Sequence, residues 1–156
     1  MIRGRTAIAP ARVLAIAGGI AAGAVLAFGG DDAREPTQAG YVEQVSAICE
    51  TYGKQLDQIP PPSDPASPGA VFESISNALP ILKEQAVRVR SLDTPKALRS
   101  QLDRFFDLTD RSILALERAQ REAGKRELFR MVQAITAFEE VRDQAKRAAH
   151  TIGFDC

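Results

Sequence analysis

Two cysteines, Cys49 and Cys156, are the side chains best suited to covalent chemistry in this chain. They are the only cysteines among its 156 residues. In an oxidising compartment two such thiols form a disulfide that persists. The bond would close a loop of about 108 residues, for which the chain-entropy model gives about 4–5 kcal/mol as an upper figure. We therefore predict an intramolecular Cys49–Cys156 disulfide, and the alternative is an intermolecular bond through Cys156.

Three aspartates, Asp103, Asp107 and Asp110, are spaced so that they form one stripe along a helix. A second acidic cluster follows at Glu139, Glu140 and Asp143. Two such groups facing each other could hold a hard cation such as Ca²⁺. Basic residues are interleaved with both groups, however, and Asp107 and Arg111 have the spacing of an ordinary helical ion pair. We interpret these acids as surface ion pairs, and a metal site at the three aspartates is the weaker alternative.

The motifs that common kinds of catalysis need are missing from this chain. It has one histidine, His150, and therefore neither the two histidines of a zinc-hydrolase motif nor the paired Glu-x-x-His motifs of di-iron bundles. A nucleophile–histidine pair would have to use His150, which lies near the end of the last predicted helix. We expect no enzyme activity and no cofactor.

An apolar run, Val13 to Gly30, is the feature from which we predict the cellular compartment of the protein. Its 18 residues carry no charge, and as a helix they span about 27 Å, just short of a hydrocarbon core of about 30 Å. The basic segment 1–12 precedes the run and contains Arg3, Arg5 and Arg12, whereas two aspartates follow it. Since positive charge stays on the cytoplasmic side, we expect residues 31–156 to lie on the outer side of the membrane.

The run 13–30 fits either a transmembrane signal anchor or a cleaved signal peptide. The long basic segment and the absence of a clean A-x-A site favour an anchor in the cell membrane, with a single pass. The alternative is secretion after signal cleavage. Small residues recur every four positions at Ala15, Gly19, Gly23 and Ala27. Such spacing lets two membrane helices pair, so a homodimer is possible, although the Gly- and Ala-rich composition also explains the series.

The formal net charge of zero hides an asymmetry along the chain. Three of the 20 basic residues precede the apolar run, so residues 31–156 carry 17 basic and 20 acidic side chains, a net charge of about −3. A domain with this charge has no electrostatic reason to bind nucleic acid. Its length, 126 residues, is enough for one domain with a real core.

Four amphipathic stretches follow a short linker at residues 31–36 and predict four helices. The first covers 37–59 and ends at three prolines, and the second starts at Pro68 with Ser67 as its cap. The third opens at Pro95 after the cap Thr94, and Gly124 separates it from the fourth, which Gly153 ends. Apolar residues recur at intervals of three and four in each stretch. The first two stretches place inward Tyr41, Val45, Ile48, Tyr52, Leu56, Ile59, Val71, Ile75, Leu79, Leu82, Ala86 and Val89. The last two place inward Leu98, Leu102, Phe105, Phe106, Thr109, Ile113, Leu116, Met131, Ile135, Phe138, Val141, Ala145, Ala149 and Ile152.

These stripes and the short connections predict an all-α fold, in which residues 37–156 form an up-down-up-down four-helix bundle. A long hairpin with a loosely docked first helix is the alternative. Thr109 interrupts an apolar face and Pro80 lies inside a helix, so together they could mark a small cavity. We favour the simpler explanation, in which the Thr109 hydroxyl bonds back to its own helix and Pro80 only bends its helix.

Four motifs in one order resemble a set of exported helical proteins. They are Val45-Ser46-Ala47-Ile48-Cys49, Ile59-Pro60-Pro61-Pro62, Leu92-Asp93-Thr94-Pro95, and the closing segment Ala149 to Cys156. Over residues 40–156 the chain resembles uncharacterised exported two-cysteine helical proteins of actinobacteria, often described as membrane proteins or lipoproteins. The resemblance implies export and a helical fold, and no activity or site residues. Unlike the lipoprotein members, this chain has no cysteine to lipidate near its apolar run.

The function that the sequence favours is binding without catalysis. We expect an extracytoplasmic interaction module, held at the membrane by residues 13–30, whose partner is an unknown envelope protein. The alternative is an exported carrier that holds an apolar small molecule between its helices near Pro80.

The predicted orientation is tested with protease on intact protoplasts. A tag at the C-terminus should be degraded without lysis, because residues 31–156 are expected outside the cell. A cytoplasmic marker protein in the same cells should survive, which controls for leakage. A C-terminal tag that stays protected until lysis contradicts the orientation.

Overall fold

The computed structural model describes residues 36–155, and within them every regular element is helical. The elements are α1 (Gln38–Leu56), α2 (Pro68–Arg90), the short 3₁₀ helix η1 (Lys96–Leu98), α3 (Arg99–Gly124) and α4 (Leu128–Ile152). The predicted all-α class is therefore confirmed for this part of the chain. None of its helices combines the length and the apolar character that a membrane crossing requires. The run 13–30, with Ala15, Gly19, Gly23 and Ala27, lies outside the described residues, as does Cys156.

Local sequence explains most helix ends. The Gly40 N–H donates to Thr37 Oγ1 at 3.1 Å, so Thr37 caps α1. Gly153 has a φ of +100°, a left-handed conformation that suits glycine, and it ends α4 as predicted. Ser67 precedes Pro68 at the start of α2 as predicted, although its hydroxyl makes no capping bond. The first helix ends at Leu56, three residues earlier than predicted.

Two further predicted boundaries need correction. After Pro95 the chain first forms η1, in which the Leu98 N–H donates to the Pro95 carbonyl oxygen at 3.0 Å, so α3 starts only at Arg99. Gly124 does not separate the last two helices, because it is still the last residue of α3. A Cβ on Gly124 would lie 3.3 Å from the Phe72 ring, so this glycine permits a close approach of α2. The turn follows it and includes Arg126 at a φ of +60°.

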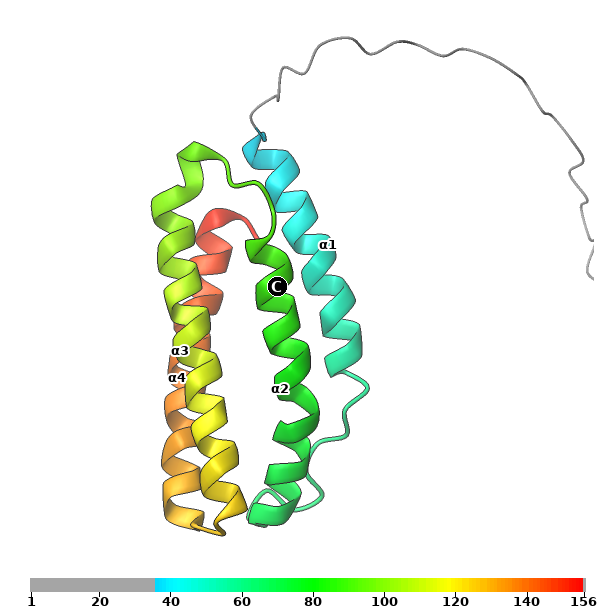
Figure 1. Cartoon of the computed structure of the whole chain (residues 1–156), viewed down its shortest axis with the longest axis vertical. Coiled ribbons are helices and arrows are strands. Elements are labelled where there is room, and N and C mark those ends of the chain that lie inside the picture. Colours follow the sequence, from blue (N-terminus) through cyan, green and yellow to red (C-terminus); the bar gives the residue numbers. More distant parts are fainter. Residues whose placement is uncertain (1–35, 156) are drawn as a thin grey trace, which may run out of the picture. The chain divides into compact units, whose positions relative to one another are not determined.

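Consecutive helices of the bundle run in opposite directions (Figure 1). The pair α3–α4 packs most extensively, and α2 packs on α3 and α1 on α2. One core cluster, the upper core, uses residues from all four helices and lies near the red end of α4 in Figure 1. It contains Tyr41, Val45, Cys49, Val89, Leu98, Leu102, Ala149, Ile152 and Phe154.

The second cluster, the lower core, has no residue from α1. It joins α2, α3 and α4 through Val71, Ile75, Leu79, Leu116, Ala119, Ala123, Met131 and Ala134. Most of the predicted inward positions are buried or half-buried, in agreement with the stripes. Leu108, Ala119 and Ala123 are buried as well, and the prediction omitted them. Their burial follows from the position of α3, which contacts both α2 and α4 and therefore has a wider inner face than one stripe.

The helical register predicts opposite effects for one substitution at two leucines of α3. Leu102 is 1% exposed and Leu114 is 60% exposed. Leu102→Asp should unfold the bundle, because burying an unpaired carboxylate costs several kcal/mol against a typical total stability of about 5–15 kcal/mol. Leu114→Asp is the matched control and should leave the urea midpoint nearly unchanged. Circular dichroism during urea unfolding measures both, and equal tolerance at the two positions would contradict the register.

Candidate functional site

A cavity of about 310 Å³ lies between the helices, where the upper core meets the side chains that flank the lower core. We call it the central cavity. All four α-helices line it, and most of the lining is apolar. Its residues are Cys49, Gly53, Leu56, Leu82, Gln85, Ala86, Val89, Phe105, Thr109, Ser112, Ile113, Phe138, Arg142, Ala145, Lys146 and Ala149.

Small residues explain why this part of the bundle is hollow. Gly53, Ala86, Ala145 and Ala149 all line the cavity, at positions where a bundle of this kind is usually filled by larger side chains. A Cβ on Gly53 would meet no other atom within 4 Å. The stripes correctly identified the three alanines as inward. An apolar stripe in the sequence shows only which face of a helix is buried. The volume left between four such faces depends on how the helices pack, so the cavity itself could not be predicted.

Thr109 and Pro80 were predicted to mark a cavity, and only Thr109 lines one. Thr109 lines the cavity, and its hydroxyl also donates to the Phe105 carbonyl oxygen at 2.9 Å, the bond predicted from its place in the helix. Pro80 is exposed and is not among the lining residues. The α2 lining begins at Leu82, two residues after Pro80, so the expected ligand position near the Pro80 kink stays a prediction.

Two cationic side chains of α4, Arg142 and Lys146, border the central cavity and were not predicted to be site residues. The Arg142 guanidinium lies 5.6 Å from the centre of the Phe138 ring and 3.2 Å from Asp143 Oδ1. Lys146 is exposed and forms no ion pair within residues 36–155. The signal in the sequence is their four-residue spacing on the flank of the apolar stripe through Ala145 and Ala149.

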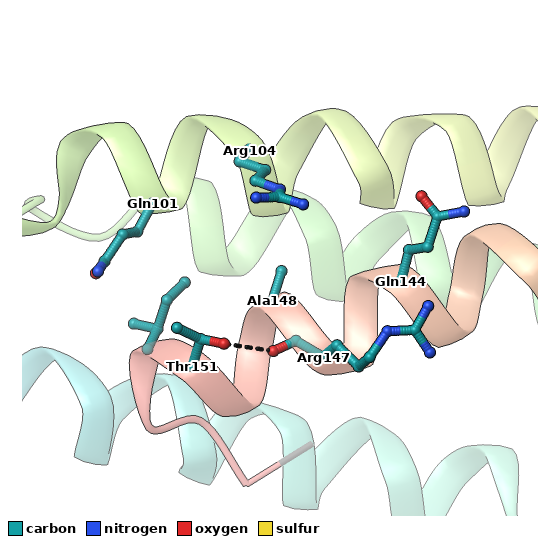
Figure 2. Close-up of a pocket in the computed structure, with 7 residues that line it drawn as sticks. Gln101, Arg104, Gln144, Arg147, Ala148 and Thr151 are labelled. Carbon is teal, nitrogen blue, oxygen red and sulfur yellow. Dashed lines mark hydrogen bonds between the residues drawn. The ribbon is translucent and has the colours of Figure 1, made fainter.

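A second hollow, of about 490 Å³, is a polar groove between α3 and α4 (Figure 2). Gln101 and Arg104 come from α3, and Gln144, Arg147 and Thr151 come from α4. The Thr151 hydroxyl donates to the Arg147 carbonyl oxygen at 2.9 Å, which is the dashed line in Figure 2. All five side chains are exposed. Because nothing in the described structure fixes the two guanidinium groups, the groove is less preorganised than the central cavity.

Two of the three aspartates in the α3 stripe, Asp107 and Asp110, form ion pairs. Asp107 Oδ2 lies 3.8 Å from Arg111 Nη1, the pair that the spacing predicted. Asp110 Oδ1 instead lies 2.6 Å from Nη2 of Arg90 on α2, and this arginine also stacks 5.0 Å from the Phe106 ring. The described residues contain no group of three or more His, Cys, Asp or Glu that could hold a metal ion. The three aspartates Asp103, Asp107 and Asp110 thus form no such group.

The C-terminal segment returns to the flank of α1 that bears Cys49. The Asp155 N–H donates to Ser46 Oγ at 3.4 Å, and Ser46 is one helical turn before Cys49. Phe154 is buried in the upper core, with its ring 6.0 Å from that of Tyr41. Cys49 is 8% exposed, and no free cysteine occurs within the described part of the chain.

Two titratable groups with shifted pKa values lie outside the central cavity. Burial raises the pKa of Tyr41 above its ordinary value, and the nearby Thr94 side chain partly offsets this rise. The Tyr41 hydroxyl nevertheless has no hydrogen bond of acceptable geometry within the described residues. On the surface of α1, the hydrogen bond from Lys54 and its charge lower the pKa of Glu50. His150 is exposed in the last turn of α4 and does not line the cavity.

An exposed apolar patch occupies the first turns of α4. Phe129 is 74% exposed, and Leu128 and Val132 beside it are also exposed. Phe129 and Val132 border a shallow surface hollow that continues along α4 to Glu140. We call Leu128, Phe129 and Val132 the α4 patch. Exposed apolar residues that adjoin one another often mark a site of protein–protein contact.

Comparison of the chain with known protein families, with curated proteins and with solved structures finds no match. The resemblance to exported actinobacterial proteins therefore stays a prediction.

Proposed function

We propose that the bundle is a non-catalytic binding module that takes a small apolar molecule into its central cavity. In this proposal residues 13–30 hold the bundle at the outer face of the cell membrane, or are cleaved so that it is secreted. The observation that carries the proposal is the central cavity itself, to which all four helices contribute largely apolar side chains.

The size and the lining of the cavity favour a ligand over trapped water. Ligand sites commonly occupy about 300–1,000 Å³ and combine an apolar wall with a few polar groups, and the 310 Å³ cavity fits this description. Its uncharged polar lining is limited to Gln85, Thr109 and Ser112. Water needs two to four polar partners to be well held, whereas each methylene transferred into an apolar site gains about 0.8 kcal/mol.

A second candidate function is binding to an envelope protein, and the α4 patch favours it. Leu128, Phe129 and Val132 are exposed apolar residues near one another in the first turns of α4, and the bundle itself does not cover them. The two functions are distinguished during purification from the envelope. A carrier should contain an organic molecule that solvent extraction releases, whereas a pure interaction module should be empty.

Filling the cavity tests the first function. Gly53→Leu should raise the free energy of unfolding by about 1 kcal/mol, because leucine favours the helix over glycine and its side chain enters open space. It should also weaken binding of the neutral apolar dye N-phenyl-1-naphthylamine about tenfold or more. Fluorescence titration measures the affinity, and urea unfolding measures the stability.

The matched control is Gln55→Leu, which adds the same side chain on the exposed face of α1. It should bind the dye as the original protein does. Dye binding that is unaffected by Gly53→Leu, or weakened equally by Gln55→Leu, would show that the dye does not occupy the central cavity.

We also propose that Cys49 and Cys156 form an intramolecular disulfide that fastens the C-terminal segment to α1. The Asp155–Ser46 hydrogen bond supports this pairing, because it brings the residue before Cys156 to within one turn of Cys49 along α1. The absence of a free cysteine among residues 36–155 is consistent with it.

Non-reducing electrophoresis of protein purified from the envelope tests the disulfide. We expect a monomer in which neither thiol reacts with an alkylating reagent. Reduction should lower the free energy of unfolding by up to about 4–5 kcal/mol, the entropic figure for so long a loop. A reducible dimer, or two freely alkylated thiols, would refute the intramolecular bond.

A further inference from the structure

The charges around the central cavity differ from those of the surrounding domain. Residues 31–156 carry 17 basic and 20 acidic side chains, so acids are in excess. The cavity lining nevertheless includes two cations, Arg142 and Lys146, and no carboxylate. A site with this lining attracts negative charge, and the general composition of the domain does not explain it.

The two cations contribute unequally. Arg142 already has an acidic neighbour, since Asp143 Oδ1 lies 3.2 Å from its Nη2, and its contact with Phe138 holds it beside the apolar lining. Lys146 has no ion pair within the described residues, and its exposed ammonium stands one helical turn further along the same flank of α4. Lys146 is therefore the group available to pair with an anion at the cavity mouth.

Most of the apolar lining of the cavity comes from the neighbouring helices. Leu82 and Val89 on α2, and Phe105 and Ile113 on α3, line the cavity together with Phe138. A volume of 310 Å³ holds about ten groups of the size of a water molecule or a methylene. The cavity thus matches a molecule with a short apolar chain and one charged end.

We infer that the central cavity binds a single-chain amphipath with an acidic head group, of the kind represented by a fatty acid with a chain of about ten carbons. The carboxylate pairs with Lys146 and, more weakly, with Arg142, while the chain lies among the apolar side chains of α2 and α3. This inference rests on the proposed function, because it names the ligand class of the same cavity.

The test compares decanoate with 1-decanol, which has the same chain length and no charge. Each is titrated against dye-loaded protein, and displacement of N-phenyl-1-naphthylamine gives its affinity. Decanoate should bind at least fivefold more tightly than decanol at low salt, and the difference should shrink at high salt. Lys146→Gln should abolish most of the preference, because it weakens decanoate binding much more than decanol binding.

Arg147→Gln is the matched control, because it removes one positive charge at the adjacent position of α4, in a residue that lines the polar groove instead of the cavity. It should keep the preference for decanoate. Equal affinities for decanoate and decanol, or equal losses in the two variants, would overturn the inference and leave the cavity function intact. Displacement by neither compound would overturn both.

A final experiment uses vesicles of an anionic diacyl phospholipid to test whether Lys146 binds a membrane surface instead of a single amphipath. Like decanoate, these lipids have a negatively charged head group, but a vesicle surface is too large to enter the cavity. Protein that sediments with these vesicles through Lys146, and does not respond to decanoate, would show that the cation serves a membrane surface, which contradicts the inference.

Discussion

The position of α1 depends on a small aromatic cluster at one end of the bundle. Phe154, just beyond α4, lies 6.0 Å from Tyr41 of α1 and 5.5 Å from Phe105 of α3 in ring-centre distance. Since α1 supplies nothing to the lower core, these contacts and their upper-core neighbours hold it against the other helices. The left-handed turn at Gly153 is what directs Phe154 back into the core.

The central cavity follows from this arrangement. With α1 fixed in the upper core, its residues Gly53 and Leu56 reach the middle of the bundle, where Ala86, Ala145 and Ala149 leave the space unfilled. An unfilled apolar volume is destabilising, because its lining atoms lack partners. A bound apolar chain would restore those contacts, so ligand binding at this place would also stabilise the middle of the bundle.

Much of the fold could be predicted from the sequence, because helix ends and apolar faces are local signals. Thr37, Pro68 and Gly153 mark boundaries through their own backbone and hydrogen-bonding preferences. Gly124 misled the prediction, since its small size serves contact with Phe72, a partner far away in the chain. Arg90 was missed as the partner of Asp110 for the same reason, as the pair joins two helices. The site was only partly predictable. The inward alanines could be identified from the stripes, whereas the central cavity and the position of Arg142 and Lys146 beside it depend on how the four helices pack.

The upper core also joins residues that are distant in sequence, such as Tyr41 and Phe154, whereas the helices of the lower core are connected by shorter segments. Bringing distant segments together carries a larger entropic cost of loop closure. We therefore expect α1 to dock late in folding and to detach first in the native state, while α2, α3 and α4 stay packed. Such partial opening would uncover the α1 side of the central cavity without unfolding the domain. A disulfide at Cys49 would limit how far α1 moves, and with it how widely this side of the cavity opens.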